Sequence, residues 1–137
     1  MEIKLKTQSH AAFSIYYHVI LSVKYRHKCI TAEMLERLGA IFTKVCKDWR
    51  CALVEFNGES DHVRLLVEAH PSLNLARMIG NLKTVSARLI RKEYAEQLKP
   101  FFWKNKFWNN AYAVVSAGGH ASLEQLLAYI QDQASPE

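Results

Sequence analysis

Residues 60–68 read Ser60-Asp61-His62-Val63-Arg64-Leu65-Leu66-Val67-Glu68. In a β-strand the side chains alternate between two faces, so the aliphatic residues at 63, 65 and 67 share one face and are expected to cover a core. His62 and Arg64 share the other face, which should look outward or into a cleft. The strand pattern alone fits either a functional strand or a surface strand with scattered polar residues.

The segments around this strand predict further strands and helices. Phe13 to Val23 is rich in β-branched and aromatic residues, which favours a strand. Apolar residues recur at helical spacing from Met34 to Trp49, after Thr31, which can cap a helix. The same spacing predicts a second helix from about Ser72 to Ile90. Further strands are expected at Ala52–Phe56, at His62–Glu68 and within Phe107–Ser116.

This order predicts an α+β fold of the ferredoxin-like βαββαβ type, an antiparallel sheet with helices on one face. Asn57-Gly58 is expected to form the hairpin turn before the His62 strand. Ser122 with Gln125 forms a capping box, after the break at Gly118-Gly119, for an extra C-terminal helix that carries Tyr129. No repeat or long linker divides the chain, so residues 1–137 are expected to form one domain.

The composition limits the class of protein. Half of the 137 residues are apolar, and the net charge of +5 permits a polyanionic partner without establishing one. No apolar run is long enough for a transmembrane helix, and the N-terminus lacks the apolar block of a signal peptide, which predicts a cytoplasmic protein without a membrane partner. Cys29, Cys46 and Cys51 are an odd number without close pairing, so buried or half-buried thiols are expected rather than disulfides or a structural zinc site.

Two segments carry residues suited to binding nucleic acid. The second predicted helix has Arg77, Lys83 and Arg88 away from its apolar stripe. Residues 101–110 interleave rings with lysines and amides, and within them Trp103 and Lys104 are candidates to stack a base and hold a phosphate. A basic helical face is often only solvated, and most of these rings are expected in the core. Together with the net charge, the two segments nevertheless make nucleic acid the best-supported partner.

The predicted C-terminal helix places Tyr129 and Gln133 on one face, because they are four residues apart. A tyrosine and a glutamine one turn apart, with a strand histidine such as His62, can build a metal-assisted nucleophilic site. Tyr129 lies at the flank of the apolar stripe. A packing role with a hydrogen-bonded hydroxyl therefore stays open, and it is the commoner role for such a tyrosine.

Several short motifs, in their order along the chain, resemble those of the single-tyrosine (Y1, HUH-type) transposases of the IS200/IS605 type. Tyr17-His18-Val19-Ile20 followed by Val23-Lys24-Tyr25-Arg26 resembles the family's "YH(I/V)V…KYR" start, and Asp61–Val67 resembles its "DHVHLLV" strand. Further similarities lie in Lys83, Ser86 and Arg88 ("LK…SSR"), Phe107-Trp108 ("(L/F)W"), Gly118-Gly119, and Tyr129-Ile130 with Gln133 ("YI..Q"). The match spans about Phe13 to Gln133, nearly the whole chain.

The resemblance implies a specific activity. Tyr129 would attack a phosphodiester of folded single-stranded DNA, forming a 5′-phosphotyrosine link and a free 3′-OH that are later rejoined. His62 and Gln133 would hold one divalent metal, Mg²⁺ or Mn²⁺, which polarises the scissile phosphate. The family also implies a homodimer that binds DNA hairpins at transposon ends. In that dimer the tyrosine helix usually completes the partner's site, and Gly118-Gly119 would be the hinge.

Arg64 departs from the family pattern, which has a second histidine ligand at this position. A guanidinium has no acceptor and carries a permanent charge, so it cannot bind a cation. Three interpretations are open, and we rank an inactive or strongly impaired copy that still binds DNA first. In the second, Arg64 grips the scissile phosphate directly. In the third, Asp61 or, with less support, Glu68 supplies a substitute oxygen ligand.

Two other functions compete with the transposase. A non-catalytic DNA-hairpin-binding protein derived from such an enzyme would keep the scaffold and lose the chemistry. An RNA-binding module of the same fold would stack bases on aromatic residues of the sheet. The RNA-binding function is the weaker of the two, because the glycine and aromatic signature of such modules is missing from the strands.

Overall fold

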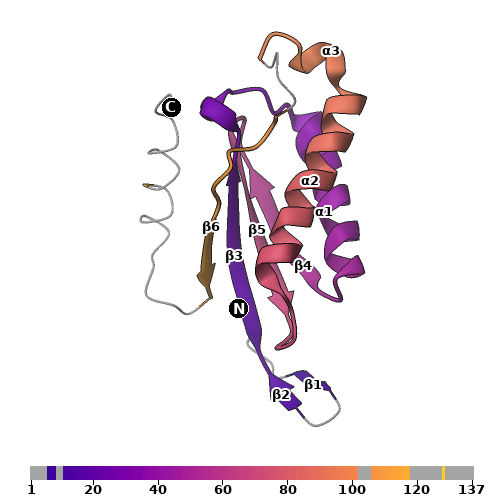
Figure 1. The fold of residues 1–137 in the computed structure, drawn as a ribbon, viewed down its shortest axis with the longest axis vertical. Coiled ribbons are helices and arrows are strands. Elements are labelled where there is room, and N and C mark those ends of the chain that lie inside the picture. Colours follow the sequence, from indigo (N-terminus) through magenta and orange to yellow (C-terminus); the bar gives the residue numbers. More distant parts are fainter. Residues whose placement is uncertain (1–5, 9–10, 102–105, 118–127, 129–137) are drawn as a thin grey trace.

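The computed structural model describes residues 6–8, 11–101, 106–117 and 128. In this part of the chain, four strands form an antiparallel sheet in the order β4-β5-β3-β6. The strands are β3 (Ile15–Ser22), β4 (Ala52–Gly58), β5 (His62–Ala69) and β6 (Ala113–Ser116). A separate two-stranded ribbon of β1 (Lys6–Gln8) and β2 (Ala11–Phe13) projects from the start of β3 (Figure 1).

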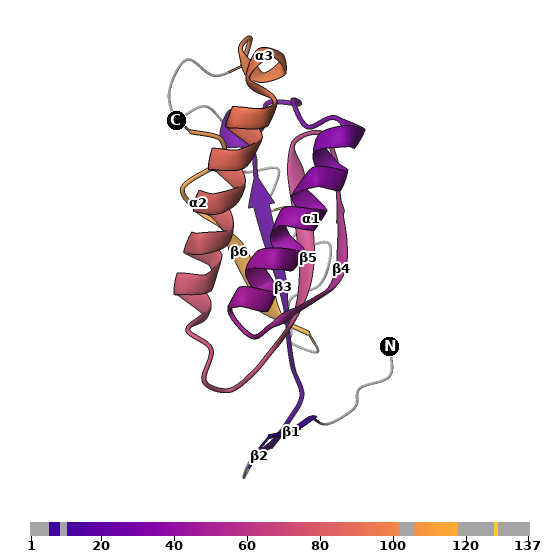
Figure 2. The ribbon, with the colours of Figure 1, turned by 90° about the vertical axis from the view of Figure 1, so that its right-hand side faces the viewer.

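The helices cover one face of the sheet. Helix α1 (Ala32–Asp48) and helix α2 (Leu75–Glu93) lie side by side on that face (Figures 1 and 2). Two short elements, η1 (Lys24–Arg26) after β3 and α3 (Ala95–Leu98) after α2, complete the described elements. The predicted ferredoxin-like order is confirmed, because β3, α1, β4, β5, α2 and β6 follow one another along the chain. The predicted C-terminal helix lies outside the described residues, apart from residue 128.

The two helix starts have a local cause. Thr31 caps α1 as predicted, since its Oγ1 accepts a hydrogen bond of 3.1 Å from the backbone N–H of Met34. Helix α2 begins later than predicted. The backbone N–H of Leu73 closes a turn onto the carbonyl of His70, so the cap is Asn74 rather than a residue near Ser72.

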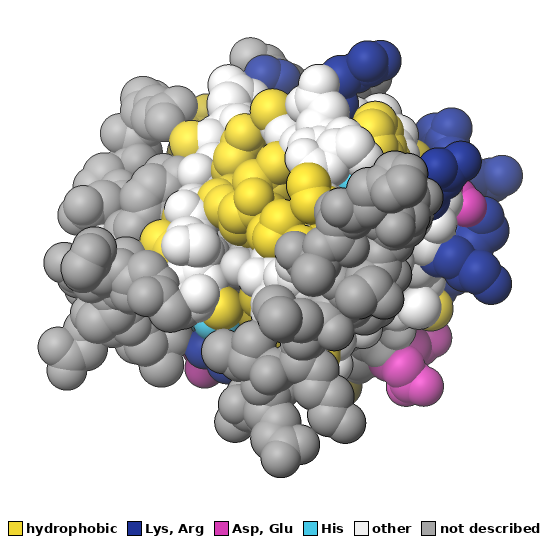
Figure 3. Space-filling view, turned by 90° about the horizontal axis from the view of Figure 1, so that it is seen from below, with side chains coloured by type: hydrophobic (Ala, Val, Ile, Leu, Met, Phe, Trp, Pro, Cys, Tyr) yellow, Lys and Arg dark blue, Asp and Glu magenta, His cyan; other side chains and the backbone are white. Residues whose placement is uncertain are grey.

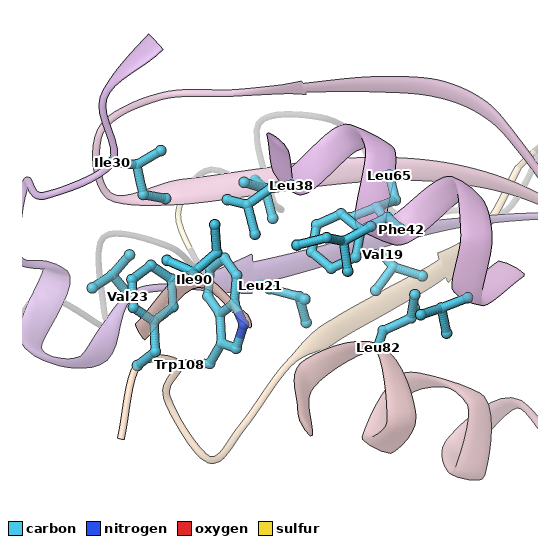
Figure 4. Close-up of a cluster of buried hydrophobic side chains, with 14 of the residues drawn as sticks. Val19, Leu21, Val23, Ile30, Leu38, Phe42, Leu65, Leu82, Ile90 and Trp108 are labelled. Carbon is cyan, nitrogen blue, oxygen red and sulfur yellow. The ribbon is translucent and has the colours of Figure 1, made fainter. Parts of the chain in front are cut away.

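The hydrophobic core fills the space between the helices and the sheet (Figure 4). Phe42 of α1 is fully buried and contacts the rings of Phe56 and Trp108, with centroids 5.5 and 6.4 Å away. Burial of a side chain of this kind stabilises the fold by about 1.5–3 kcal/mol. Figure 4 shows the residues with which the sheet and the two helices face one another: Val19, Leu21 and Leu65 from the sheet, Leu38 and Phe42 from α1, and Leu82 and Ile90 from α2.

The three cysteines are free, and the expectation of buried thiols is confirmed. Cys29 and Cys46 lie in the core, and Cys51 is half-buried at its edge. Burial raises the pKa of Cys29 and of Cys46 to about 12, because the apolar surroundings disfavour a thiolate. Separately, no helix of the described residues is both long and apolar enough to cross a membrane.

The hairpin between β4 and β5 differs from the prediction. Asn57 and Gly58 end strand β4, paired with Arg64 and Val63, and the turn follows them. The backbone N–H of Glu59 closes the turn onto the carbonyl of His62 at 2.9 Å. A Cβ at Gly58 would lie 2.7 Å from that same carbonyl oxygen, so glycine is needed for the close approach of the strands rather than for the turn.

A buried hydrogen-bond chain ties α2 to the segment that precedes β6. Trp108 donates its indole N–H to Ser86 Oγ at 2.9 Å, and Ser86 Oγ donates to the carbonyl of Leu82 at 2.6 Å. Ser86 is fully buried and Trp108 is 5% exposed, so water cannot replace either bond. Ser86 of the "LK…SSR" motif is therefore a packing residue that fixes the tryptophan.

Ser86→Ala is expected to lower the free energy of unfolding by about 1–3 kcal/mol, the cost of leaving a buried indole N–H without an acceptor. Urea denaturation followed by tryptophan fluorescence measures the change. Thr84→Ala, on the exposed face of the same helix, serves as the control and should change stability by no more than about 0.5 kcal/mol. Equal effects of the two substitutions would show that the Ser86 hydrogen bond contributes nothing.

Candidate functional site

Strand β5 presents different chemistry on its two faces. Val63, Leu65 and Val67 are fully buried in the core beneath the helices, as the alternation predicted. His62 and Arg64 project from the opposite face. In the sheet register His62 lies opposite Ser22, and Arg64 lies between Ile20 on β3 and Asn57 on β4. The two residues therefore share the sheet face opposite helices α1 and α2.

His62 is held by the residue before it. Its Nδ1 lies 2.8 Å from Oδ1 of Asp61, which is 5% exposed. An ionised carboxylate can only accept, so Nδ1 carries the proton of this bond. In the neutral imidazole the lone pair is then on Nε2, which is the arrangement that a metal-binding histidine needs.

Arg26 holds the other oxygen of Asp61. Its Nε donates to Oδ2 at 2.9 Å, and its Nη2 donates to the same oxygen. Asp61 also accepts the backbone N–H of Val23 on its carbonyl at 2.9 Å. The carboxylate therefore bridges the turn after β3 and the start of β5, two segments that are distant in sequence.

The turn that carries Arg26 is strained. Tyr25 and Arg26 have φ angles of 58° and 54°, in the left-handed region that side chains other than glycine rarely adopt. Each such residue costs about 1–3 kcal/mol and keeps this conformation only where its surroundings enforce it. Here the bond from the N–H of Lys24 to the carbonyl of Phe107 and the Arg26–Asp61 ion pair hold the turn in place.

Asp61 is ionised in the folded protein at neutral pH. Burial alone would raise the pKa of its carboxyl. The hydrogen bonds from His62 and Arg26, with the charge of the guanidinium, outweigh this and hold the pKa below its ordinary value. The negative charge is therefore a fixed feature of the site.

Glu59 joins this cluster. One ligand atom each of Glu59, Asp61 and His62 lie within 4.8 Å of one another. Two carboxylates and an imidazole suit Mg²⁺ or Mn²⁺ better than a thiophilic metal. The sequence interpretation did not single out Glu59, because it placed the turn at Asn57-Gly58. Had the turn been predicted at residues 59–61, Glu59 would have been expected beside His62.

The remaining candidate residues on the sheet and on α2 have different surroundings. Glu68 accepts a 2.6 Å hydrogen bond from the hydroxyl of Tyr16 at the far end of β5, away from His62. Lys83 donates to the carbonyls of Asn109 and Asn110 at 2.6 and 2.8 Å. Arg77 and Arg88 are exposed on α2. Viewed from below, lysine and arginine side chains gather on the helix side of the molecule (Figure 3).

Six of the predicted site residues fall outside the part of the chain that the structure describes. They are Trp103, Lys104, Gly118, Gly119, Tyr129 and Gln133. The described chain thus contains His62 and Arg64 on one sheet face. The roles predicted for the tyrosine and the glutamine stay predictions.

Comparison with known proteins assigns the family. The family model described as "Transposase IS200 like" matches residues 11–133. The chain belongs to this family. Membership places it among DNA transposases, in agreement with the resemblance found in the sequence motifs.

Individual relatives agree with this assignment. The chain is 25% identical to the transposase for insertion sequence element IS200 of Salmonella typhimurium, over 93% of this chain and 82% of that protein. It is 27% identical to the ISDra2 transposase TnpA of Deinococcus radiodurans, over 100% of this chain and 96% of that protein. A crystal structure from Deinococcus radiodurans, named as that of a transposase, superposes with a TM-score of 0.83 at 26% identity, covering 95% of this chain and 98% of the other.

A more distant structure shares the fold. It is a REP-associated tyrosine transposase bound to a REP hairpin, which matches with a TM-score of 0.52 at 8% identity. The match covers 90% of this chain and 68% of the other. At this identity the likeness supports the ferredoxin-like architecture alone.

Asp61→Asn is expected to destabilise the metal-free protein by about 3 kcal/mol at pH 7, because it leaves Arg26 without its counter-ion in a largely buried place. The folded-state pKa of Asp61 is depressed, so its contribution is present above the ordinary aspartate pKa of about 3.9 and is lost as the pH falls through the folded value. Urea unfolding at pH 7 and pH 3 in the presence of a chelator measures both parts.

The exposed pair Lys44–Asp48 supplies the control. Asp48→Asn should cost no more than about 0.5 kcal/mol at either pH, because water screens the pair. A loss for Asp61→Asn that is as large at pH 3 as at pH 7 would contradict an ionised carboxylate at this position.

Proposed function

We propose that the chain is a single-stranded DNA transposase that cuts and rejoins DNA through Tyr129, with a divalent metal held by His62 and Gln133. The observation that carries the proposal is the geometry of His62. Asp61 binds the Nδ1 proton of His62 and so leaves the Nε2 lone pair for a metal, on the sheet face opposite helices α1 and α2. Family membership supplies the reaction class.

The proposed reaction is a reversible transesterification. The Tyr129 hydroxyl attacks the scissile phosphorus, the bond to the 3′ oxygen breaks, and that oxygen leaves as a 3′-OH after taking up a proton. The product is a 5′-phosphotyrosine ester, and attack by a 3′-OH on this ester rejoins the strand and frees the tyrosine. A bound divalent metal would offset the charge that develops on the phosphate oxygens.

The donor set around His62 partly fits such a metal. His62 offers an imidazole nitrogen, and the carboxylates of Asp61 and Glu59 offer oxygen ligands within reach. Arg64 does not fit, because its positive charge repels a cation and it has no lone pair. Arg26 already pairs with the carboxylate of Asp61 and so competes with a metal for it. We therefore propose a weakened metal site, in which Glu59 supplies part of what the second family histidine provides, because His62 and Arg26 already engage both oxygens of Asp61.

Arg64 has a second proposed role. It is half-buried, and none of the ion pairs among the described residues involves it. A guanidinium on this face matches the geometry of a phosphate, which it can contact with two parallel hydrogen bonds. The same property favours the alternative function, a DNA-hairpin-binding protein that has lost its chemistry, because Arg64 would keep phosphate binding while removing a metal ligand.

The proposed assembly follows the family. The chain would form a homodimer that binds hairpins of single-stranded DNA at the transposon ends. Gly118-Gly119 would let the helix with Tyr129 move, so that it completes the site of its own subunit or of the partner subunit. This arrangement is a proposal that rests on family membership.

A covalent-adduct assay tests the chemistry. The protein is mixed with labelled single-stranded DNA from the sequence flanking its gene, with Mg²⁺ or Mn²⁺, and run on a denaturing gel beside Tyr129→Phe and Arg64→His. We expect little adduct from the parent and at least about tenfold more from Arg64→His, because the second histidine restores a ligand. Tyr129→Phe should form none.

The double variant Arg64→His/Tyr129→Phe is the matched control. An adduct that persists in the double variant would exclude Tyr129 as the nucleophile. If DNA binds but neither the parent nor Arg64→His forms an adduct, the non-catalytic alternative is the better description.

Metal binding is measured apart from the reaction. Titration of Mn²⁺ followed by electron paramagnetic resonance should show binding that tightens about 10–100-fold in Arg64→His. His62→Ala should abolish the tight site in that background. Equal Mn²⁺ affinity in the parent and in Arg64→His would mean that Arg64 does not disturb the metal site.

A further inference from the structure

A basic pocket that does not include His62 is lined by helix α2 and by residues 106–110, the segment that leads into β6. Its volume is about 330 Å³, a size that suits a small ligand or one unit of a polymer. Four of its lining residues are cationic: Lys83, Arg88, Arg91 and Lys106. No aspartate or glutamate is among the lining residues. The ligand that this charge pattern favours is an anion.

Hydrogen bonds hold the two walls of the pocket together and fix the second wall to the sheet. Lys83 on α2 reaches across to the carbonyls of Asn109 and Asn110, and Trp108 is fixed to Ser86. The side-chain amide of Asn109 donates to Ser22 Oγ at 2.9 Å. The pocket is therefore formed before any ligand arrives, which lowers the entropic cost of binding.

Two of the cations remain available to a ligand. Arg88 and Lys106 are exposed, and within the described residues neither takes part in an ion pair or a side-chain hydrogen bond. Lys83, by contrast, already uses two of its three donors on the backbone of the opposite wall. Lys83 therefore helps to build the pocket, whereas Arg88 and Lys106 lie at its rim and can contact a ligand.

The pocket is connected to the His62 site through one residue. The backbone N–H of Asn109 donates to the carbonyl of Ser22 at 2.9 Å, and Ser22 is the register partner of His62. The wall that carries Asn109 is therefore hydrogen-bonded to β3, and β3 pairs with the start of β5, where His62 lies.

We propose that this pocket holds a backbone phosphate of the DNA strand whose neighbouring nucleotides occupy the His62 site, with Arg88 and Lys106 as its charged contacts. The proposal rests on the proposed function for the identity of the polymer. A guanidinium and an ammonium bind a phosphate through charge-assisted hydrogen bonds without reading a base. The pocket therefore anchors the strand independently of its sequence.

The test compares two double variants of equal charge. Arg88→Gln/Lys106→Gln removes the rim of the pocket. Arg50→Gln/Lys47→Gln removes one arginine and one lysine that are exposed at the end of α1 and outside the pocket. Fluorescence anisotropy with single-stranded DNA of several sequences, at a series of salt concentrations, gives the affinity and its salt dependence.

For the pocket variant we expect about tenfold weaker binding for every sequence. The slope of log K against log salt should become smaller in magnitude by about 1.4, the value for two phosphate contacts on a single strand. The α1 variant should change the slope by less than about 0.5. Equal losses of DNA affinity in both variants would show that only net charge matters, which would overturn the proposal. A pocket variant with unchanged DNA affinity would overturn it as well. Urea unfolding of each variant checks that both remain folded.

A competition experiment tests whether the pocket binds DNA or a small anion. Inorganic phosphate in excess should displace DNA only as far as its ionic strength predicts. Displacement by phosphate at the same concentration as DNA would assign the pocket to a small anion and overturn the strand anchor. A parent chain that binds no single-stranded DNA refutes the proposed function itself, whereas a parent that binds DNA with an unaffected pocket variant refutes the pocket alone.

Discussion

The carboxylate of Asp61 is the interaction on which the site depends. One oxygen orients the imidazole of His62, the other accepts the guanidinium of Arg26, and the backbone carbonyl accepts the N–H of Val23. These bonds join the turn after β3 to the start of β5. They also enforce the left-handed conformations of Tyr25 and Arg26. A single buried charge therefore fixes the orientation of the His62 imidazole and the shape of the loop beside it.

The sheet divides the molecule into a stabilising side and a working side. Val63, Leu65 and Val67 contribute the core, and the alternating His62 and Arg64 point the other way. Because alternate residues of the same strand are packed in the core, the backbone that carries His62 and Arg64 is held rigidly. Arg64 projects from the face opposite the core, between Ile20 and Asn57, so its charge acts mainly on the chemistry of that face.

Sequence reasoning succeeded where the determining interactions are local. The period of two in β5, the helical spacing in α1 and the Thr31 cap were all predicted, since each depends on residues a few positions apart. It failed at Asn57-Gly58, where pairing with β5 outweighs the turn preference of the dipeptide, and it therefore missed Glu59. It could not predict the conformation of Arg26 either, because Asp61 enforces it from 35 residues further along the chain.

The pairing of β3 with β6 has a consequence for the order in which parts of the protein can fold. Tyr17, near the start of the chain, is the register partner of Ser116, near its end. Contacts between such distant segments form slowly, because a long loop must close before they gain any stability. Asn109, which lines the basic pocket and binds Ser22, belongs to the same late segment. A nascent chain that still lacks residues 106–116 therefore has neither the second wall of the basic pocket nor the strand that pairs with β3 on that side.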